Sequence, residues 1–175
     1  MAWRVVTYRL PSEPSRHRVA VWRELRKVGA VSLQQATWAI PTGGIFDAAL
    51  DRAKAIVERA DGQLIVLGVA VDDPGIATLE AAYTAEREAE WTEFVRECAK
   101  FEAELDHEVE IEKFTLAELD EEEQNCERLR RWYRELRGRD LFGAPTAGVA
   151  EVRLKECNES LEGFAEQVYE ARERP

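Results

Sequence analysis

In the first part of this chain, the hydrophobic and polar positions predict strands that alternate with helices. The segment WRVVTYRL (3–10) alternates and is rich in β-branched and aromatic side chains, so it predicts a strand. The segment QLIVLGVAV (63–71) is a continuous apolar run, which is typical of a strand in a central position. Residues 30–41 are long enough for two short strands, with Gln34 and Gln35 near the turn or a bulge.

Two helices are predicted between these strands. Residues 16–28 follow a possible cap at Ser12 or Ser15 and stop at Gly29. The apolar stripe of this helix is expected to contain Val21, Trp22, Leu25 and Val28. Residues 45–60 form the second helix, with one face lined by Phe46, Leu50, Ala53, Ile56 and Val57. The resulting order β-α-β-β-α-β predicts a ferredoxin-like α+β domain over residues 1–72.

The pattern changes after VDDPG (71–75), which we interpret as a hinge or linker. Apolar residues then recur mostly at steps of three and four through three helical stretches, of which the first ends near His107 and the others cover about 115–138 and 146–172. The seams contain Trp91, Phe94, Cys98, Phe101 and Leu105; Leu119, Cys126, Leu129, Tyr133 and Leu136; and Ala150, Leu154, Cys157, Leu161, Phe164 and Val168. Residues 73–175 are therefore expected to form an antiparallel three-helix bundle, with a capping box from Thr115 to Glu118.

Charge is distributed unevenly between these two regions. Residues 1–70 contain 10 Lys and Arg against 6 Asp and Glu, a net charge of +4, whereas residues 71–175 contain 14 against 29, a net charge of −15. The total of −11 argues against indiscriminate nucleic-acid binding but leaves room for a local basic surface. The chain has no apolar run long enough for a membrane span and no signal-peptide pattern, so we expect a cytoplasmic protein with reduced cysteines and no membrane partner.

The helix over 16–28 is the first candidate site. Its cations could contact the phosphates of nucleic acid, and the candidates are Arg16, Arg18, Arg23, Arg26 and Lys27. The alternative is the solvated outer face of a helix that packs on a sheet. The residues alone favour this alternative, because Arg side chains also keep edges and surfaces soluble. The first half contains no helix-turn-helix signature that would shift this balance.

An arginine cluster in residues 128–139 is the second candidate. Converging guanidinium groups bind tetrahedral oxyanions through paired donors, and we take Arg130, Arg134, Arg137 and Arg139 as the candidate oxyanion site. The acidic run ELDEEEQNCE lies just upstream, so salt bridges within the bundle are the alternative interpretation, and the residues alone favour it.

The positions of the three cysteines favour a layer of buried core residues over a metal or redox site. Cys98, Cys126 and Cys157 are expected at a similar height in the bundle, where a soft-metal or redox site is the less favoured alternative. The sequence contains no CxxC, P-loop, nucleophile elbow or dinucleotide-binding motif, and its two histidines are far apart. We therefore expect no cofactor, no metal and no enzymatic activity.

Three segments carry a family resemblance: EPSRHRVAVWRELRKVGAVSLQQATWAIP, CERLRRWYRELRGRDLFGAP and ECNESLEGFAEQVYEA. They resemble the N-terminal region of the ChrB chromate-resistance family, and the resemblance covers nearly the whole chain. It implies a chromate-responsive transcriptional regulator whose partners are promoter DNA and chromate or a related oxyanion. It raises nucleic-acid contact by the basic helix to parity with the outer-face alternative.

The first domain also resembles the dimerisation fold of PaaX-type repressors and small CRISPR-associated endonucleases, which suggests a homodimer through the sheet or the strand near Trp38. The alternative function is a protein-interaction module of the stress response that binds no DNA. In that case the acidic bundle would bind a partner protein, and the basic helix would only keep the first domain soluble.

Overall fold

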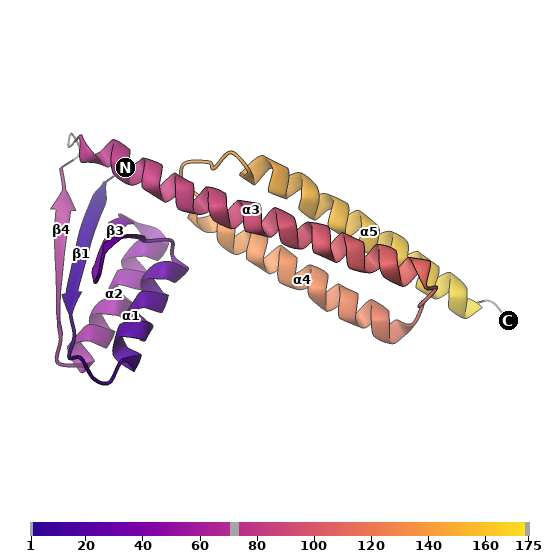
Figure 1. Ribbon diagram of the computed structural model, residues 1–175, viewed down its shortest axis with the longest axis horizontal. Coiled ribbons are helices and arrows are strands. Elements are labelled where there is room, and N and C mark those ends of the chain that lie inside the picture. Colours follow the sequence, from indigo (N-terminus) through magenta and orange to yellow (C-terminus); the bar gives the residue numbers. More distant parts are fainter. Residues whose placement is uncertain (1, 71–73, 174–175) are drawn as a thin grey trace. The chain divides into compact units, whose positions relative to one another are not determined.

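The computed structural model describes residues 2–70 and 74–173 (Figure 1). Its elements are β1 (Trp3–Arg9), α1 (Arg16–Lys27), β2 (Val31–Gln34), β3 (Thr37–Pro41), α2 (Gly44–Arg59), β4 (Gln63–Val69), α3 (Gly75–Glu110), α4 (Leu116–Arg139) and α5 (Ala147–Glu173). In the described residues this is an α+β fold with one four-stranded antiparallel sheet and five helices.

The chain divides into two compact units, the sheet unit (Met1–Glu86) and the helical unit (Arg87–Pro175). The division falls within α3. The boundary expected between residues 72 and 73, and most of the expected linker at 71–75, lie outside the described residues. The two short strands expected over 30–41 are confirmed as β2 and β3.

The strand order in the sheet is β2-β3-β1-β4, which corrects the expectation for residues 63–71. This segment is β4, and it lies at an edge of the sheet, with β1 as its strand neighbour. Its Ile65 and Leu67 are 44% and 56% exposed. A continuous apolar run shows that both faces of a strand are apolar, but it does not show whether another strand lies on each side.

Helix α1 packs through Val21 and Leu25, which are both fully buried. Trp22 was expected in the same stripe, and this expectation was wrong, because its side chain is 46% exposed. Successive residues of a helix point about 100° apart, so Val21 and Trp22 cannot both face the sheet. Gly29 ends the helix as expected, with φ 80° and its N–H donating to the carbonyl oxygen of Arg26 at 2.9 Å.

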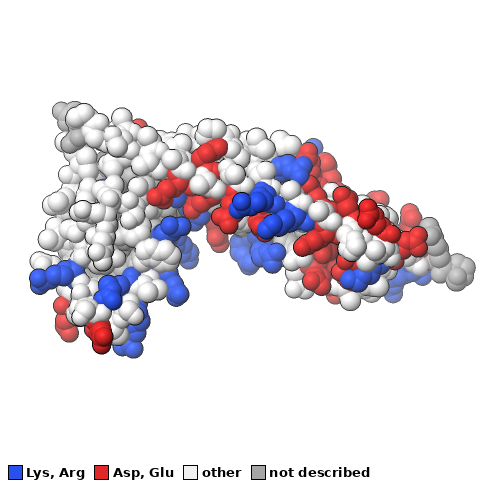
Figure 2. All heavy atoms as spheres, in the orientation of Figure 1, with Lys and Arg blue, Asp and Glu red and all other residues white. Residues whose placement is uncertain are grey.

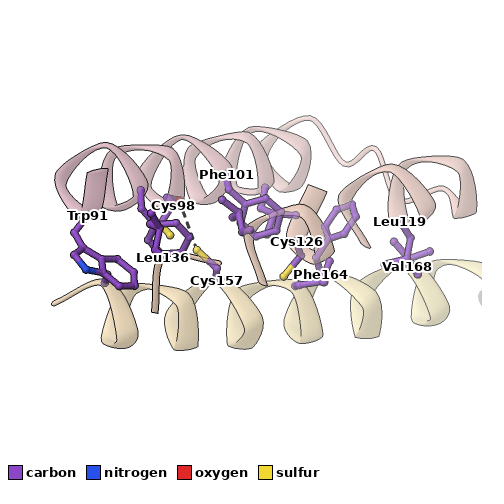
Figure 3. Close-up of a cluster of buried hydrophobic side chains, with 14 of the residues drawn as sticks. Trp91, Cys98, Phe101, Leu119, Cys126, Leu136, Cys157, Phe164 and Val168 are labelled. Atoms are coloured by element: carbon purple, nitrogen blue, oxygen red, sulfur yellow. Dashed lines mark hydrogen bonds between the residues drawn. The ribbon is translucent and has the colours of Figure 1, made fainter. Parts of the chain in front are cut away.

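In the helical unit, α3, α4 and α5 share one hydrophobic core (Figure 3). The apolar seams expected from the sequence are confirmed, since each contributes to this core either as buried or as partly buried residues. Thr115 caps α4 by accepting a hydrogen bond from the backbone N–H of Glu118 at 3.2 Å. Within residues 2–70 and 74–173, no helix has the length and apolar character that crossing a bilayer requires.

Candidate nucleic-acid and oxyanion sites

The outer face of α1 combines exposed cations with an exposed aromatic ring. Arg16, Arg23 and Arg26 are exposed, and the guanidinium carbon of Arg26 lies 5.4 Å from the centroid of the Trp22 ring. In Figure 2, basic side chains appear as separate patches on the lower part of the sheet unit, with acidic side chains beside some of them. We call Arg16, Trp22, Arg23, Arg26 and Lys27 the α1 basic face.

Two residues of α1 are engaged in other contacts. Arg18 donates from its guanidinium to the carbonyl oxygen of Pro11 at 2.9 Å and to that of Ser12, so it holds the loop that precedes the helix. Glu24, the acidic residue of α1, forms an ion pair with Arg52 of α2, with 2.6 Å between Nε and Oε2. Because Glu24 is held against α2, its charge is not available to neutralise the α1 basic face.

The four arginines of the candidate oxyanion site do not meet at one point. Arg130 donates from Nε to the side-chain oxygen of Asn158 at 2.8 Å and also approaches Glu127 at 3.6 Å. Arg134 pairs with the same carboxylate of Glu127 at 3.0 Å. Arg139 pairs with Glu90 of α3 at 3.1 Å, and Arg137 is exposed in the last turn of α4.

Glu127 therefore occupies a position where two guanidinium groups converge. Its carboxylate accepts from Arg134 and lies beside Arg130, and these two cations lower the pKa of Glu127, with Arg134 as the larger cause. Within the candidate oxyanion site, Arg130 and Arg134 are thus the two arginines that share one anionic partner. Glu127 is the last residue of the acidic run ELDEEEQNCE, which predicts salt bridges to the cluster, whereas no pattern in the sequence indicated Asn158 as a partner of Arg130.

The turn that follows the arginine cluster is fixed by Asp140, which is 6% exposed. Its carboxylate accepts from the indole N–H of Trp91 at 2.9 Å and from the backbone N–H groups of Gly143 and Ala144 at 3.1 and 3.0 Å. Arg139 beside it is held by Glu90, which also pairs with Arg87 at 2.7 Å. The segment Arg139–Asp140 is thus tied to α3.

Two further arginines of the cluster line a cavity. Arg128 and Arg131 line a cavity of about 380 Å³ between α3 and α4, together with Lys100 and Trp132. Glu97, Glu104 and Glu135 also line it, so the cavity carries mixed charge. No motif in the sequence indicated this pairing of α3 and α4 side chains.

The three cysteines are free and buried. Cys157 donates from Sγ to the carbonyl oxygen of Cys98 at 3.7 Å, and Cys126 lies further along the core in Figure 3, donating to Asn158 at 3.3 Å. A hydrogen bond between the Cys98 and Cys157 side chains lowers the pKa of Cys98 and, together with burial, raises that of Cys157. Burial raises the pKa of Cys126. Among the described residues, no group of three or more His, Cys, Asp or Glu side chains could hold a metal ion.

Comparison with known proteins gives one family. The model of the family described as Protein ChrB, N-terminal, matches residues 18–175, which include α1 from Arg18 onward and the whole helical unit. No curated protein and no solved structure matches the chain.

Proposed function

The chain belongs to the ChrB N-terminal family, and on that premise we propose that it is a cytoplasmic transcriptional regulator that responds to chromate or a related oxyanion. Family membership associates the chain with chromate resistance. We place DNA contact on the α1 basic face and oxyanion binding on the α4 arginines, and we assign no catalytic step. The element order and the strand order support a ferredoxin-like sheet unit that is followed by an antiparallel three-helix bundle.

The observation that carries the DNA-binding proposal is the α1 basic face. Its cations project from one helix, and an exposed ring lies beside Arg26. A helix of this kind can place several guanidinium groups along one phosphate backbone, while Trp22 supplies apolar contact. Arg18 acts indirectly in this proposal, because it already holds the loop before α1.

The test compares two triple variants of equal charge. Arg16→Ala, Arg23→Ala and Arg26→Ala remove cations from α1, whereas Arg9→Ala, Lys54→Ala and Arg59→Ala remove as many from exposed positions on β1 and α2 and leave the pair between Arg52 and Glu24 intact. Fluorescence anisotropy would measure binding to a duplex from upstream of the gene and to a scrambled duplex, at two salt concentrations. We expect the α1 variant to bind at least tenfold more weakly, with a salt slope smaller by about 2.7, since each phosphate contact contributes roughly 0.9.

Two outcomes would contradict this assignment. Equal losses in the two variants would mean that general charge, and not α1, determines binding. Unchanged affinity and salt slope in the α1 variant would exclude α1 as the contact surface.

We place the oxyanion on Arg130 and Arg134, in exchange for the carboxylate of Glu127. Chromate is a tetrahedral dianion, and two guanidinium groups at one point offer it paired donors. Arg137 is exposed one turn beyond Arg134 and can add a third donor. Arg139 contributes less directly, because Glu90 already holds it in place.

This exchange predicts opposite effects from two substitutions. Glu127→Gln removes the competing charge and is expected to tighten chromate binding several-fold, whereas Arg134→Gln weakens it at least tenfold. Isothermal titration of each variant with chromate and with sulfate, a dianion of the same shape, measures both affinity and selectivity. If Glu127→Gln weakened binding or left it unchanged, the carboxylate would not compete for the site.

A second function has its own support in the helical unit. Helix α5 exposes Val149, Val152 and Tyr169, which are 52%, 56% and 55% exposed, and the α4 arginines have acidic partners within this unit. These features favour a protein-interaction module in the stress response. Absence of DNA binding at low salt, together with an unchanged response to chromate in Arg134→Gln, would support this function over the regulator.

A further inference from the structure

Strand β4 has an open hydrogen-bonding edge. In the described residues its strand neighbour is β1, with which it pairs without interruption from Trp3↔Val69 to Arg9↔Gln63. The N–H and C=O groups on its other side therefore have no strand partner in the described part of the sheet. Figure 1 shows β4 as the outermost strand of the sheet unit.

The side chains on β4 are apolar and exposed on both faces of the sheet. Ile65, Val66 and Leu67 are 44%, 40% and 56% exposed, and successive residues of a strand point to opposite faces. Residues 63–69 contain no charged residue and no proline. Figure 2 shows the surface around β4 and β1 as largely free of Lys, Arg, Asp and Glu.

The opposite edge of the same sheet is built differently. Strand β2 has four residues, it includes Ser32 and Gln34, and its pairing with β3 is interrupted by a bulge between these two positions. Short length, polar residues and bulges are the features that keep an edge strand from pairing with another chain. Strand β4 has seven residues and pairs with β1 without a bulge, and its one polar residue, Gln63, lies at its end.

We propose that β4 pairs antiparallel with β4 of a second copy of this chain, which joins the two sheets into one of eight strands. In a continuous antiparallel sheet, two residues that lie opposite each other point to the same face. The two-fold axis perpendicular to the sheet must therefore pass between one residue and the same residue of the second copy. Pairing that uses all seven residues centres on Val66. It places Ile65 opposite the partner's Leu67, and Val66 opposite the partner's Val66.

A second copy suits this edge better than a charged partner does. In the self-pairing, residues 64–68 meet residues 64–68 of the partner without a polar or charged side chain among them, and Gln63 meets Val69 at the two ends. The sheet unit is also the part of the chain that lacks the acidic excess, since residues 1–70 carry a net charge of +4. One pair of seven-residue strands is a small interface, so we expect a dissociation constant in the micromolar range.

The dimer has a consequence for the proposed function, although it does not depend on it. An axis perpendicular to the sheet keeps the same face of both copies on the same side. Helices α1 and α2 pack together beside the sheet in Figure 1, so both α1 basic faces would lie on one side of the dimer. Two-fold symmetry of this kind matches a palindromic DNA site.

The first test measures association without DNA. Sedimentation equilibrium of the full chain from about 1 to 500 µM is expected to show a monomer–dimer equilibrium with micromolar affinity. Val66→Lys places two ammonium groups opposite each other and should raise the dissociation constant at least tenfold. The matched control is Leu33→Lys on the β2 edge, which is 45% exposed in the wild type and should leave the equilibrium unchanged.

A second test reads the register and does not depend on the lysine variant. Opposed residues in antiparallel strands have Cα atoms about 4.5–5.5 Å apart, which permits a disulfide. Val66→Cys should therefore form a covalent dimer on mild oxidation, while Gln63→Cys, at the end of the strand, should not. Circular dichroism would check that each variant is folded.

Three results would overturn the proposal. They are a monomer throughout the concentration range, equal weakening by Val66→Lys and Leu33→Lys, and equal cross-linking at positions 63 and 66. A dimer that forms as expected but binds no DNA would leave this inference intact and refute only the proposed function.

Discussion

Asp140 offers the sharpest test of how the arginine segment is held, through the substitution Asp140→Ala. The carboxylate accepts from Trp91, Gly143 and Ala144 at 2.9–3.1 Å. Gly143 is exposed and can donate to water instead, but Trp91 and Ala144 are 0% and 4% exposed. Each buried donor left without an acceptor costs about 1–3 kcal/mol, so we expect Asp140→Ala to destabilise the helical unit by about 2–6 kcal/mol.

Urea unfolding followed by circular dichroism at 222 nm measures this loss. Asp106→Ala, at an exposed position on α3, is the control and should change stability by less than about 0.5 kcal/mol. Trp91→Phe and the double variant complete a thermodynamic cycle, which isolates the bond between the indole and the carboxylate. A loss below about 1 kcal/mol in Asp140→Ala, or no coupling to Trp91, would refute the assigned role of the carboxylate.

Two further predictions concern the stability of each unit. Glu122 is 4% exposed, and its pKa is raised by burial, against the opposing hydrogen bond from Asn125, so its folded pKa lies above the ordinary value of 4.5. The free energy of unfolding therefore falls as the pH rises from 4.5 through the folded pKa, because the buried carboxyl group must lose its proton. Glu122→Gln removes this cost, so it should raise the urea midpoint at pH 7 but not at pH 3. Gly62→Ala should cost at least about 2 kcal/mol in thermal unfolding, because a Cβ there would lie 2.6 Å from the carbonyl oxygen of Arg9. Gly138→Ala, which meets no atom within 4 Å in α4, should instead be neutral or stabilise by up to about 1 kcal/mol.

The helices of this chain could be predicted because their packing is encoded locally. Steps of three and four residues place Trp91, Phe94 and Cys98 on one side of α3, and all three are fully buried. The capping of α4 by Thr115 follows from neighbouring residues in the same way. A property that depends on residues within one or two turns is visible in the sequence.

The properties that sequence did not predict depend on distant partners. Whether β4 lies at an edge is decided by the absence of a strand beyond it, and the exposure of Trp22 is decided by how α1 is rotated on the sheet. The arginine cluster is similar, because Arg130 meets Asn158 of α5 and Arg139 meets Glu90 of α3. The spacing of the arginines along α4 therefore predicted which of them share a helix face, but it did not predict their partners on α3 and α5.

Charge distribution connects these local findings to the proposed function. The acidic excess in residues 71–175 would repel DNA over long range at low ionic strength, but at about 0.15 M salt the Debye length is only about 8 Å. Under those conditions, the proposed contact between the α1 basic face and phosphates would be governed by the cations at the interface and not by the net charge of −11. The number of cations at that proposed interface then sets the affinity, and the proposed dimer would double this number by presenting two α1 basic faces to the same duplex.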